Sequence, residues 1–185
     1  MVRVAPFIAC LLLAPTLGAT VLVPAPFDEV VAGSEIIAHV RVVDVRPEWA
    51  DGRKRIDSVV TVQVLSYLKG GTRPTLAFKV PGGQIGRYRS LMVGAPAFQR
   101  GEEVVLFLVA QGTAMPYVFG LNQGVFRVRQ DPASLRRVVV PPPRVASGAG
   151  PASVRRGSPA RRPIALEAFG AEVRAVMAAK RGAVR

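Results

Sequence analysis

The sequence predicts a mainly β protein: a small antiparallel β-barrel or sandwich followed by a C-terminal helix. Three observations lead to this prediction. Short segments in which apolar and polar residues alternate recur from residue 34 onward, which is typical of half-buried strands. Turn signals such as Asp51-Gly52 and Pro81-Gly82-Gly83 separate these segments at the spacing of small all-β domains. No long helical pattern occurs before residue 164, and a chain of 185 residues has the usual size of one domain.

The first elements of the predicted domain are a short helix and a bent strand. Residues 26–33 begin with proline and acidic residues and end with glycine, which predicts one or two helical turns. The strand that follows places His39 and Arg41 on the face opposite its apolar residues. Its alternation slips by one residue at Val43, so we expect a β-bulge there, with Val43 and Val45 turned inward.

The remaining strands follow one another through short turns. Strands are predicted over residues 56–67, 76–80, 84–93 (a weaker one), 104–109, 117–121, 125–129 and 135–140. Residues 104–109 are apolar on both faces, so we expect the central and most buried strand here. We expect a hairpin turn at residues 50–53, a second hairpin around Asn122-Gln123-Gly124 and a short edge strand at 135–140.

The N-terminal segment, residues 1–19, has the order of regions found in secretory signal peptides. Arg3 precedes an apolar run over residues 4–14, and small residues close the segment up to Ala19. The run is shorter than the roughly 20 residues that span a bilayer, so an uncleaved anchor is the disfavoured alternative. We expect cleavage after Ala19, with Gly18 or Thr20 as alternative ends of the removed segment, and export to the periplasm or the cell exterior. Since Cys10 lies in the removed segment, the mature chain is expected to contain no cysteine.

The C-terminal third carries most of the positive charge. The chain has a formal net charge of +13, and residues 132–185 contain 11 basic but only 2 acidic residues. This excess has two interpretations: a solvated tail, or a region that contacts anionic lipid, envelope glycan or an acidic protein. After the barrel domain at residues 20–140, the segment 141–163 is rich in proline, glycine, serine and arginine, which is typical of a flexible linker.

A terminal amphipathic helix is predicted over residues 164–185. Its apolar side chains form one stripe, made of Leu166, Phe169, Val173, Val176 and Met177. Acidic residues lie early in the helix and basic residues late, as the helix dipole favours. We expect the stripe to dock on the barrel, with binding to a partner or a membrane surface as the alternative.

The strand landmarks of residues 33–110 resemble those of a known family. They are Ser34-Glu35-Ile36-Ile37, Val60-x-Val62-x-Val64, Leu68-Lys69-Gly70, Leu76-x-Phe78-x-Val80 and Gly101-Glu102-Glu103-Val104-Val105-Leu106-Phe107-Leu108. This pattern resembles the OB-fold barrel of netrin-like modules, the group that includes tissue inhibitors of metalloproteases, and is similar to uncharacterised exported bacterial proteins. The resemblance implies an OB-like β-barrel. Those inhibitors bind the protease zinc through an N-terminal cysteine of the mature chain, which is absent here, so no functional residue is carried over.

The sequence contains no pattern typical of a catalytic, cofactor or metal site. His39, the sole histidine, lies on a predicted strand without a serine–histidine–aspartate order nearby, and we expect it at the surface. Glu102 and Glu103 are neighbours on a strand, so their side chains point to opposite faces and cannot share one substrate. The glycines of residues 81–86 do not match a phosphate-binding loop. We therefore expect no enzyme, no cofactor and no bound metal.

These observations favour an exported, non-enzymatic binding module whose partner is a protein in the cell envelope or outside the cell. The expected contacts are Arg87, Tyr88 and Arg89, together with Phe98 in the loop 94–98, because arginine and aromatic residues are enriched in binding patches. The alternative is an envelope-surface protein held to anionic lipid or glycan by its basic C-terminal region. Nucleic acid is not an expected partner, since export separates the chain from it, and we expect a monomer.

Overall fold

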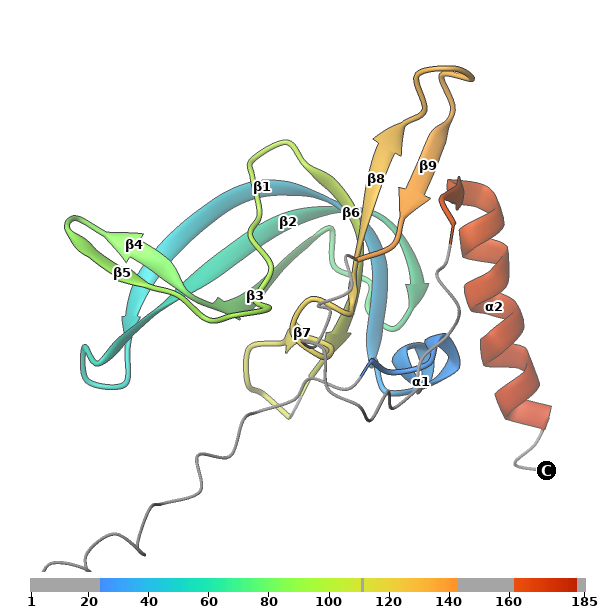
Figure 1. The fold of residues 1–185 in the computed structure, drawn as a ribbon. Coiled ribbons are helices and arrows are strands. Elements are labelled where there is room, and N and C mark those ends of the chain that lie inside the picture. Colours follow the sequence, from blue (N-terminus) through green and yellow to red (C-terminus); the bar gives the residue numbers. More distant parts are fainter. Residues whose placement is uncertain (1–23, 111, 143–161, 183–185) are drawn as a thin grey trace, which may run out of the picture.

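Five strands form a closed barrel in the computed structural model, which describes residues 24–110, 112–142 and 162–182. The described elements follow in the order α1 (Phe27–Ala32), β1 (Ile36–Ala50), β2 (Arg55–Lys69), β3 (Thr75–Pro81), β4 (Gly83–Ile85), β5 (Tyr88–Ser90), β6 (Glu103–Val109), β7 (Tyr117–Val118), β8 (Val125–Gln130), β9 (Arg137–Val140), β10 (Ile164–Ala165) and α2 (Leu166–Gly182). The barrel has the strand order β1-β2-β3-β7-β6 and closes where β6 pairs with β1 (Figure 1). The predicted mainly β, OB-like barrel with a C-terminal helix is confirmed.

The first two strands form a long curved hairpin whose tip extends beyond the barrel. The first part of β1 pairs with both β2 and β6, whereas residues 47–50 pair with β2 (Figure 1). A register shift between Val42 and Asp44 leaves Val43 outside the ladder and 45% exposed. The predicted bulge is therefore confirmed, and Val45 packs against the barrel core as predicted. The inward orientation predicted for Val43 is wrong, because the extra residue of a bulge opposes no partner residue.

Two hydrophobic cores share strand β6. Val104, Leu106 and Leu108 contribute to the core inside the barrel, whereas Val105 and Phe107 contribute to a second core outside it. All five side chains are fully buried. The prediction of a central strand that is covered on both faces is confirmed.

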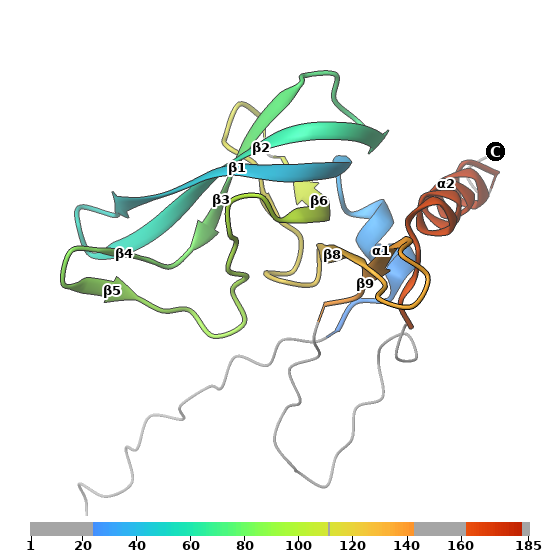
Figure 2. The same ribbon diagram turned by 90° about the horizontal axis from the view of Figure 1, so that it is seen from above.

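The second core lies between the barrel wall and the two helices, which lie side by side (Figure 2). Its centre is a cluster of four rings with centroids 5.0 to 6.2 Å apart, formed by Phe27, Phe107, Phe126 and Phe169. Phe169 and Val173 of α2 are fully buried in this core. The predicted docking of the helical stripe on the barrel is confirmed, and the burial of each large apolar side chain stabilises this arrangement by about 1.5–3 kcal/mol.

Residues 84–93 do not form the single weak strand that the sequence predicts. Instead, β4 and β5 form a small separate hairpin, with the pairs Gly83–Ser90, Gln84–Arg89 and Ile85–Tyr88. Gly86 lies in the turn with a φ of 57°, a left-handed conformation that allows the chain to reverse over two residues. Leu91, Met92 and Val93 lie beyond the hairpin and outside any strand.

Residues 117–129 do not form the predicted hairpin either. β7 pairs with β3 and β6, whereas β8 pairs with β6 and β9. The loop between them folds onto β6, where the Phe107 amide donates to the Gly124 carbonyl oxygen over 2.9 Å. A Cβ atom at Gly124 would lie 2.7 Å from the Phe107 carbonyl oxygen. The glycine that suggested a hairpin turn therefore allows close packing on β6 instead.

The sheet beyond the barrel ends in β10. Strand β9, which the sequence predicts as an edge strand, is paired on one side with β8 and on the other with β10. The predicted signal peptide, Cys10 and residues 143–161 of the predicted linker lie outside the described residues. Among the described helices, none combines the length and apolar character that crossing a membrane requires.

Candidate functional site

A small hairpin is fixed against the projecting tip of the β1–β2 hairpin. The Gly82 amide donates to the Ile56 carbonyl oxygen over 3.0 Å, and Ser58 Oγ donates to the Gly82 carbonyl oxygen over 2.8 Å. Gly83 has a φ of 151°, and a Cβ atom there would lie 2.8 Å from Ser58 Oγ and 3.2 Å from Cβ of Pro47. Glycine is thus required where β4 leaves the barrel, and it sets how closely the β4–β5 hairpin approaches β2.

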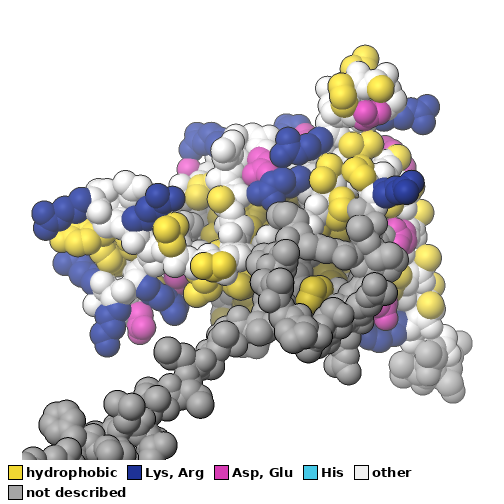
Figure 3. Space-filling model, in the orientation of Figure 1, with side chains coloured by type: hydrophobic (Ala, Val, Ile, Leu, Met, Phe, Trp, Pro, Cys, Tyr) yellow, Lys and Arg dark blue, Asp and Glu magenta, His cyan; other side chains and the backbone are white. Residues whose placement is uncertain are grey.

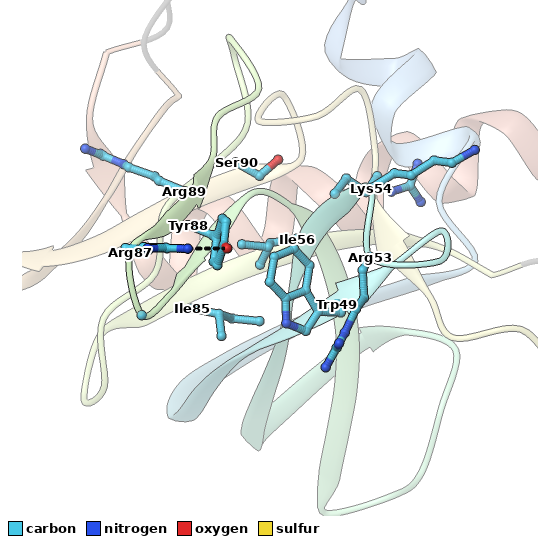
Figure 4. Close-up of a pocket in the computed structure, with 11 residues that line it drawn as sticks. Trp49, Arg53, Lys54, Ile56, Ile85, Arg87, Tyr88, Arg89 and Ser90 are labelled. Atoms are coloured by element: carbon cyan, nitrogen blue, oxygen red, sulfur yellow. Dashed lines mark hydrogen bonds between the residues drawn. The ribbon is translucent and has the colours of Figure 1, made fainter.

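An open cavity of about 700 Å³, which we name the cleft, lies between the tip of β1–β2 and the β4–β5 hairpin (Figure 4). Its size is that of a small-ligand or side-chain pocket, roughly 300–1,000 Å³. The basic residues that line it are Arg53, Lys54, Arg55, Arg87 and Arg89, and no lining residue is acidic. The apolar part of its lining consists of Trp49, Ile56, Ile85 and Tyr88. The cleft therefore combines an apolar floor with a strongly positive rim.

Two aromatic rings meet in the cleft. Trp49 of β1 and Tyr88 of β5 pack edge to face, with ring centroids 5.5 Å apart and an interplanar angle of 64°. Arg87 Nη2 donates to Tyr88 Oη over 3.1 Å, and its guanidinium carbon lies 5.2 Å from the Tyr88 ring centroid (Figure 4). Tyr88 is nevertheless 51% exposed. The two hairpins thus present an aromatic surface that a ligand can reach.

The charges of the cleft are only partly neutralised. Arg55 lies 3.3 Å from Asp57 in an ion pair along β2. Within the described residues, Arg53, Lys54 and Arg89 form no ion pair with a carboxylate. Unpaired cations over a low-dielectric wall produce a positive potential that attracts anionic ligands and raises their association rate.

The structure brings together three of the four contact residues that the sequence predicts. Arg87, Tyr88 and Arg89 line the cleft. Phe98 does not: it is 8% exposed, it belongs to the barrel core, and its ring lies 5.3 Å from that of Phe78. The expectation that Phe98 lies at the surface is therefore corrected, because the loop turns this side chain into the barrel.

The other half of the cleft was not predicted from the sequence. Trp49 and the run Arg53-Lys54-Arg55 flank the hairpin turn at Asp51-Gly52, and this turn brings them to the same end of the molecule. Strand alternation could have indicated that the single tryptophan lies beside three consecutive basic residues at a hairpin tip. Its partner Tyr88 comes from a separate hairpin, which the sequence does not place.

A second charged region, which we name the groove, crosses β6, β8 and β9. It is a shallow hollow of about 600 Å³ whose charged lining residues are Arg100, Glu102, Glu103, Arg127, Arg129 and Arg137. Glu102 pairs with Arg127 over 2.7 Å, and Arg100 pairs with Asp44 over 2.7 Å. The carboxylates of this region therefore already have arginine partners on neighbouring elements.

Glu103, which lines the groove, also contacts the buried His39 of β1. Glu103 accepts a hydrogen bond from Arg41 over 2.6 Å, lies 3.3 Å from His39 Nε2, and has Arg137 at 3.7 Å. The hydrogen bond from Arg41 holds the pKa of Glu103 below its ordinary value. Burial lowers the pKa of His39, although the Glu103 carboxylate opposes this shift.

The predicted surface position of His39 is wrong, because the side chain is 6% exposed between β1 and β6. Glu102 and Glu103 both line the groove, where Glu102 pairs with Arg127 and Glu103 with Arg41, and the expectation that they cannot share one substrate stays a prediction. In the part of the chain that the structure describes, no group of three or more histidine, cysteine, aspartate and glutamate side chains is arranged to hold a metal ion.

Comparisons with known proteins give no relative of this chain. No protein-family model, no curated protein and no solved structure matches it. The resemblance to netrin-like modules stays a prediction, and the closed five-stranded barrel fits a small OB-like fold.

Proposed function

We propose that this protein is an exported, non-enzymatic binding module that engages a partner protein in the cell envelope or outside the cell. The single observation that carries the proposal is the cleft: five basic residues and no acidic residue line it, around an accessible aromatic pair. Tryptophan, tyrosine and arginine are the residue types that dominate the binding energy of protein interfaces.

The lining of the cleft also supports a particular partner chemistry. Four of its five cations, all except Arg55, have no carboxylate partner among the described ion pairs, so an acidic segment would neutralise them without breaking an ion pair. Trp49, Ile56 and Ile85 offer an apolar surface for one aliphatic or aromatic side chain of that segment. We therefore propose an acidic segment with an apolar anchor residue as the ligand.

The construction of the cleft supports binding with little rearrangement. Gly82 and Ser58 fix one end of the β4–β5 hairpin to β2, and the contact between Trp49 and Tyr88 fixes the other end. A site whose walls are already held in place loses less conformational entropy when a ligand binds. The two carboxylates of the groove, in contrast, are engaged in ion pairs with arginines of neighbouring strands.

The experiment that tests the proposal places a photo-crosslinking amino acid at Tyr88 in the full chain, expressed in its own cells. The matched control carries the same amino acid at Leu135, which is 70% exposed and lies between β8 and β9. We expect a covalent adduct with one envelope or extracellular protein from position 88 and none from position 135. The adduct should disappear when Arg53 and Lys54 are changed to glutamate.

Three outcomes would contradict the proposal. Adducts of equal yield from both positions would mean that the cleft is not the contact surface. Retention of the adduct in the Arg53→Glu, Lys54→Glu variant would mean that its charge does not select the partner. Recovery of the intact chain, with residues 1–19 still attached, only in the cytoplasm would contradict export.

A further inference from the structure

Three consecutive apolar side chains are exposed directly after β5. Leu91, Met92 and Val93 are 75%, 49% and 88% exposed, and Leu91 and Val93 exceed every other large apolar side chain of the described residues in exposure. Isolated exposed apolar residues are ordinary, but a run of three that protrudes from a soluble surface marks an interaction site. We name residues 91–93 the apolar loop.

The apolar loop is held in shape from both sides. The Ala95 amide donates to the Met92 carbonyl oxygen over 3.1 Å, which closes a turn with Val93 and Gly94 at its centre. Gly94 has a φ of 85°, as the third position of such a turn requires. Downstream, Phe98 lies buried in the barrel core, and upstream the carbonyl oxygen of Ser90 lies beside Gly82. The apolar residues are thus presented by a preformed turn.

The surroundings of the apolar loop are basic and aromatic. Arg89 lies two residues before it, and Arg87 and Arg89 line the cleft together with the three basic residues of the β1–β2 tip. Figure 3 shows dark blue side chains around yellow ones over the β1–β2 tip and the β4–β5 hairpin. The acidic residues of this end are Glu48, which pairs with Arg46, Asp57, which pairs with Arg55, and Asp51 at the turn. Positive charge therefore predominates around the loop.

We propose that this end of the molecule docks on a phospholipid bilayer that contains anionic lipid. Leu91 and Val93 enter the boundary between headgroups and acyl chains, and the cations of the two hairpins contact the anionic headgroups. Apolar insertion and electrostatic attraction are the two contributions that peripheral membrane proteins combine. Trp49 and Tyr88 are residue types that favour the level of the headgroups, because each has an apolar ring and a polar tip.

The charge distribution favours a lipid surface over a second copy of the chain. A symmetric dimer formed through the apolar loop would bring the five cleft cations of one copy close to the same five of the other. Their repulsion opposes such a dimer, whereas an anionic bilayer offers both the missing negative charge and an apolar layer. The inference goes beyond the proposed function through the apolar loop, which does not line the cleft, and it shares with that function the cleft cations, Trp49 and Tyr88.

The test measures co-sedimentation of the full chain with vesicles of phosphatidylcholine alone and of phosphatidylcholine with phosphatidylglycerol. The double variant Leu91→Ser, Val93→Ser removes the inserted side chains, and Leu135→Ser is the matched control, since Leu135 is 70% exposed on the β8–β9 turn. We expect binding to the anionic vesicles, a loss of about tenfold or more in the double variant from the lost apolar burial, and no change in the control. Because all these side chains are exposed, the melting temperature should stay unchanged.

Trp49 gives a second readout, since it is the sole tryptophan of the chain. Its fluorescence should shift to the blue and be quenched by brominated acyl chains when the anionic vesicles bind. Chloride and inorganic phosphate at equal ionic strength should weaken binding equally, because the headgroup charge acts as part of a surface. Stronger displacement by phosphate would assign the cations to a free-anion site and overturn the proposal.

Other results would also overturn it. Equal binding to neutral and anionic vesicles, or an equal loss in the Leu135→Ser control, would remove the role of the loop and its charges. Dimerisation of the wild type that the double variant abolishes would assign the loop to self-association. The double variant should still form the photo-crosslinked adduct in detergent extract, so the membrane proposal and the proposed function can fail separately.

Discussion

The groove and the cleft both contain arginine side chains, and the two regions differ in how many of these arginines have carboxylate partners. In the groove, Arg41, Arg127 and Arg137 each lie within 4 Å of a carboxylate on another strand or at the entry of β6. In the cleft, Arg53 and Arg89 have no carboxylate partner among the described ion pairs. The carboxylates of the groove thus join β1, β6, β8 and β9 through arginines, whereas four of the five cleft cations have no carboxylate partner among the described ion pairs. Substitutions in the groove should change stability, and substitutions in the cleft should change binding.

The largest expected effect on stability comes from disrupting the barrel core, which supports both the groove and the cleft. Leu106→Asp places a charge in the barrel core on β6, where the side chain is fully buried, and it should destabilise the fold by several kcal/mol, on the order of 3–5. Thermal unfolding followed by circular dichroism measures this change. Leu135→Asp, at an exposed position, is the control. A melting temperature within a few degrees of the wild type for Leu106→Asp would contradict the assignment of β6 as the central strand.

The next largest effect is expected from a substitution in the groove that lowers stability and leaves the cleft unchanged. Glu103→Gln keeps the shape of the side chain but removes the charge that faces Arg41, His39 and Arg137, and it should lower the free energy of unfolding by about 1–3 kcal/mol. Ligand binding in the cleft should stay unchanged. Glu48→Gln, in an exposed pair with Arg46, should cost less than about 0.5 kcal/mol. Equal losses from the two variants in urea denaturation would contradict the buried role of Glu103.

Gly83→Ala tests how the cleft is built. The new Cβ would approach Ser58 Oγ at 2.8 Å and Ile56 Cγ2 at 3.1 Å, so the β4–β5 hairpin must shift away from β2, at a cost of about 1–2 kcal/mol. Tyr88 should then move from Trp49, and the fluorescence spectrum of Trp49 should change. Gly86→Ala is the control, because that position also has a positive φ but no atom within 4 Å of the new Cβ. An unchanged spectrum in Gly83→Ala would contradict the anchoring contact.

His39 and Glu103 should give the stability a pH dependence in which the cleft takes no part. Burial lowers the pKa of His39 in the folded state below 6.5, so the unfolded chain binds the proton more readily. This contribution to stability is complete above pH 6.5 and is lost as the pH falls from there through the folded-state pKa. Glu103, whose pKa is also lowered, adds a further loss as the pH falls below 4.5.

His39→Gln should abolish the loss of stability that begins below pH 6.5 and keep the loss below pH 4.5 that Glu103 causes. The measurement is the midpoint of urea unfolding at a series of pH values from neutral to acid. Neither His39 nor Glu103 lines the cleft, so the affinity of the cleft for its ligand should not follow the loss of stability that His39 causes. A wild-type stability that rises on acidification just below pH 6.5 would contradict the direction of the His39 shift.

The smallest effect on stability is expected in the cleft itself. Arg53→Gln and Lys54→Gln remove exposed charges without ion-pair partners, so the free energy of unfolding should change by less than about 0.5 kcal/mol. Binding of an acidic ligand should weaken by about tenfold for the pair, with a weaker salt dependence. Arg46→Gln, whose side chain pairs with Glu48, is the matched arginine control. If the Arg53→Gln, Lys54→Gln variant lost stability but kept its affinity for the ligand, the cleft charges would serve stability and not binding.

The sequence predicted those elements whose apolar and polar pattern lies within their own residues. The burial of strand β6 could be predicted because residues 104–108 are apolar on both faces. The docking of α2 on the barrel could be predicted because its apolar stripe follows the helical period. The bulge near Val43 was visible as a slip in the alternation. In each case the residues that form the element also carry the signal for it.

The sequence could not predict contacts that depend on the path of the chain between elements. β7 pairs with β3 and β6 because the loop around Gly124 packs on Phe107, a contact between residues 17 apart in sequence. Phe98 and His39 were assigned to the surface because nothing in their neighbourhood reveals what covers them. For the candidate site, Arg87, Tyr88 and Arg89 were predicted, whereas Trp49 was not, since its contact with Tyr88 joins two separate hairpins.

The contact between the two helices has a consequence for the order in which the protein matures during synthesis. Phe27 of α1 rests on Phe169 of α2, so the second core needs residues from both ends of the described chain. The ribosome releases α1 and β6 long before α2, and domains complete their packing only when all their parts are present. Until then Phe107 on the outer face of β6 has its contacts with Phe27 and Phe126 but lacks the one with Phe169. The second core is therefore completed only after α2 has left the ribosome.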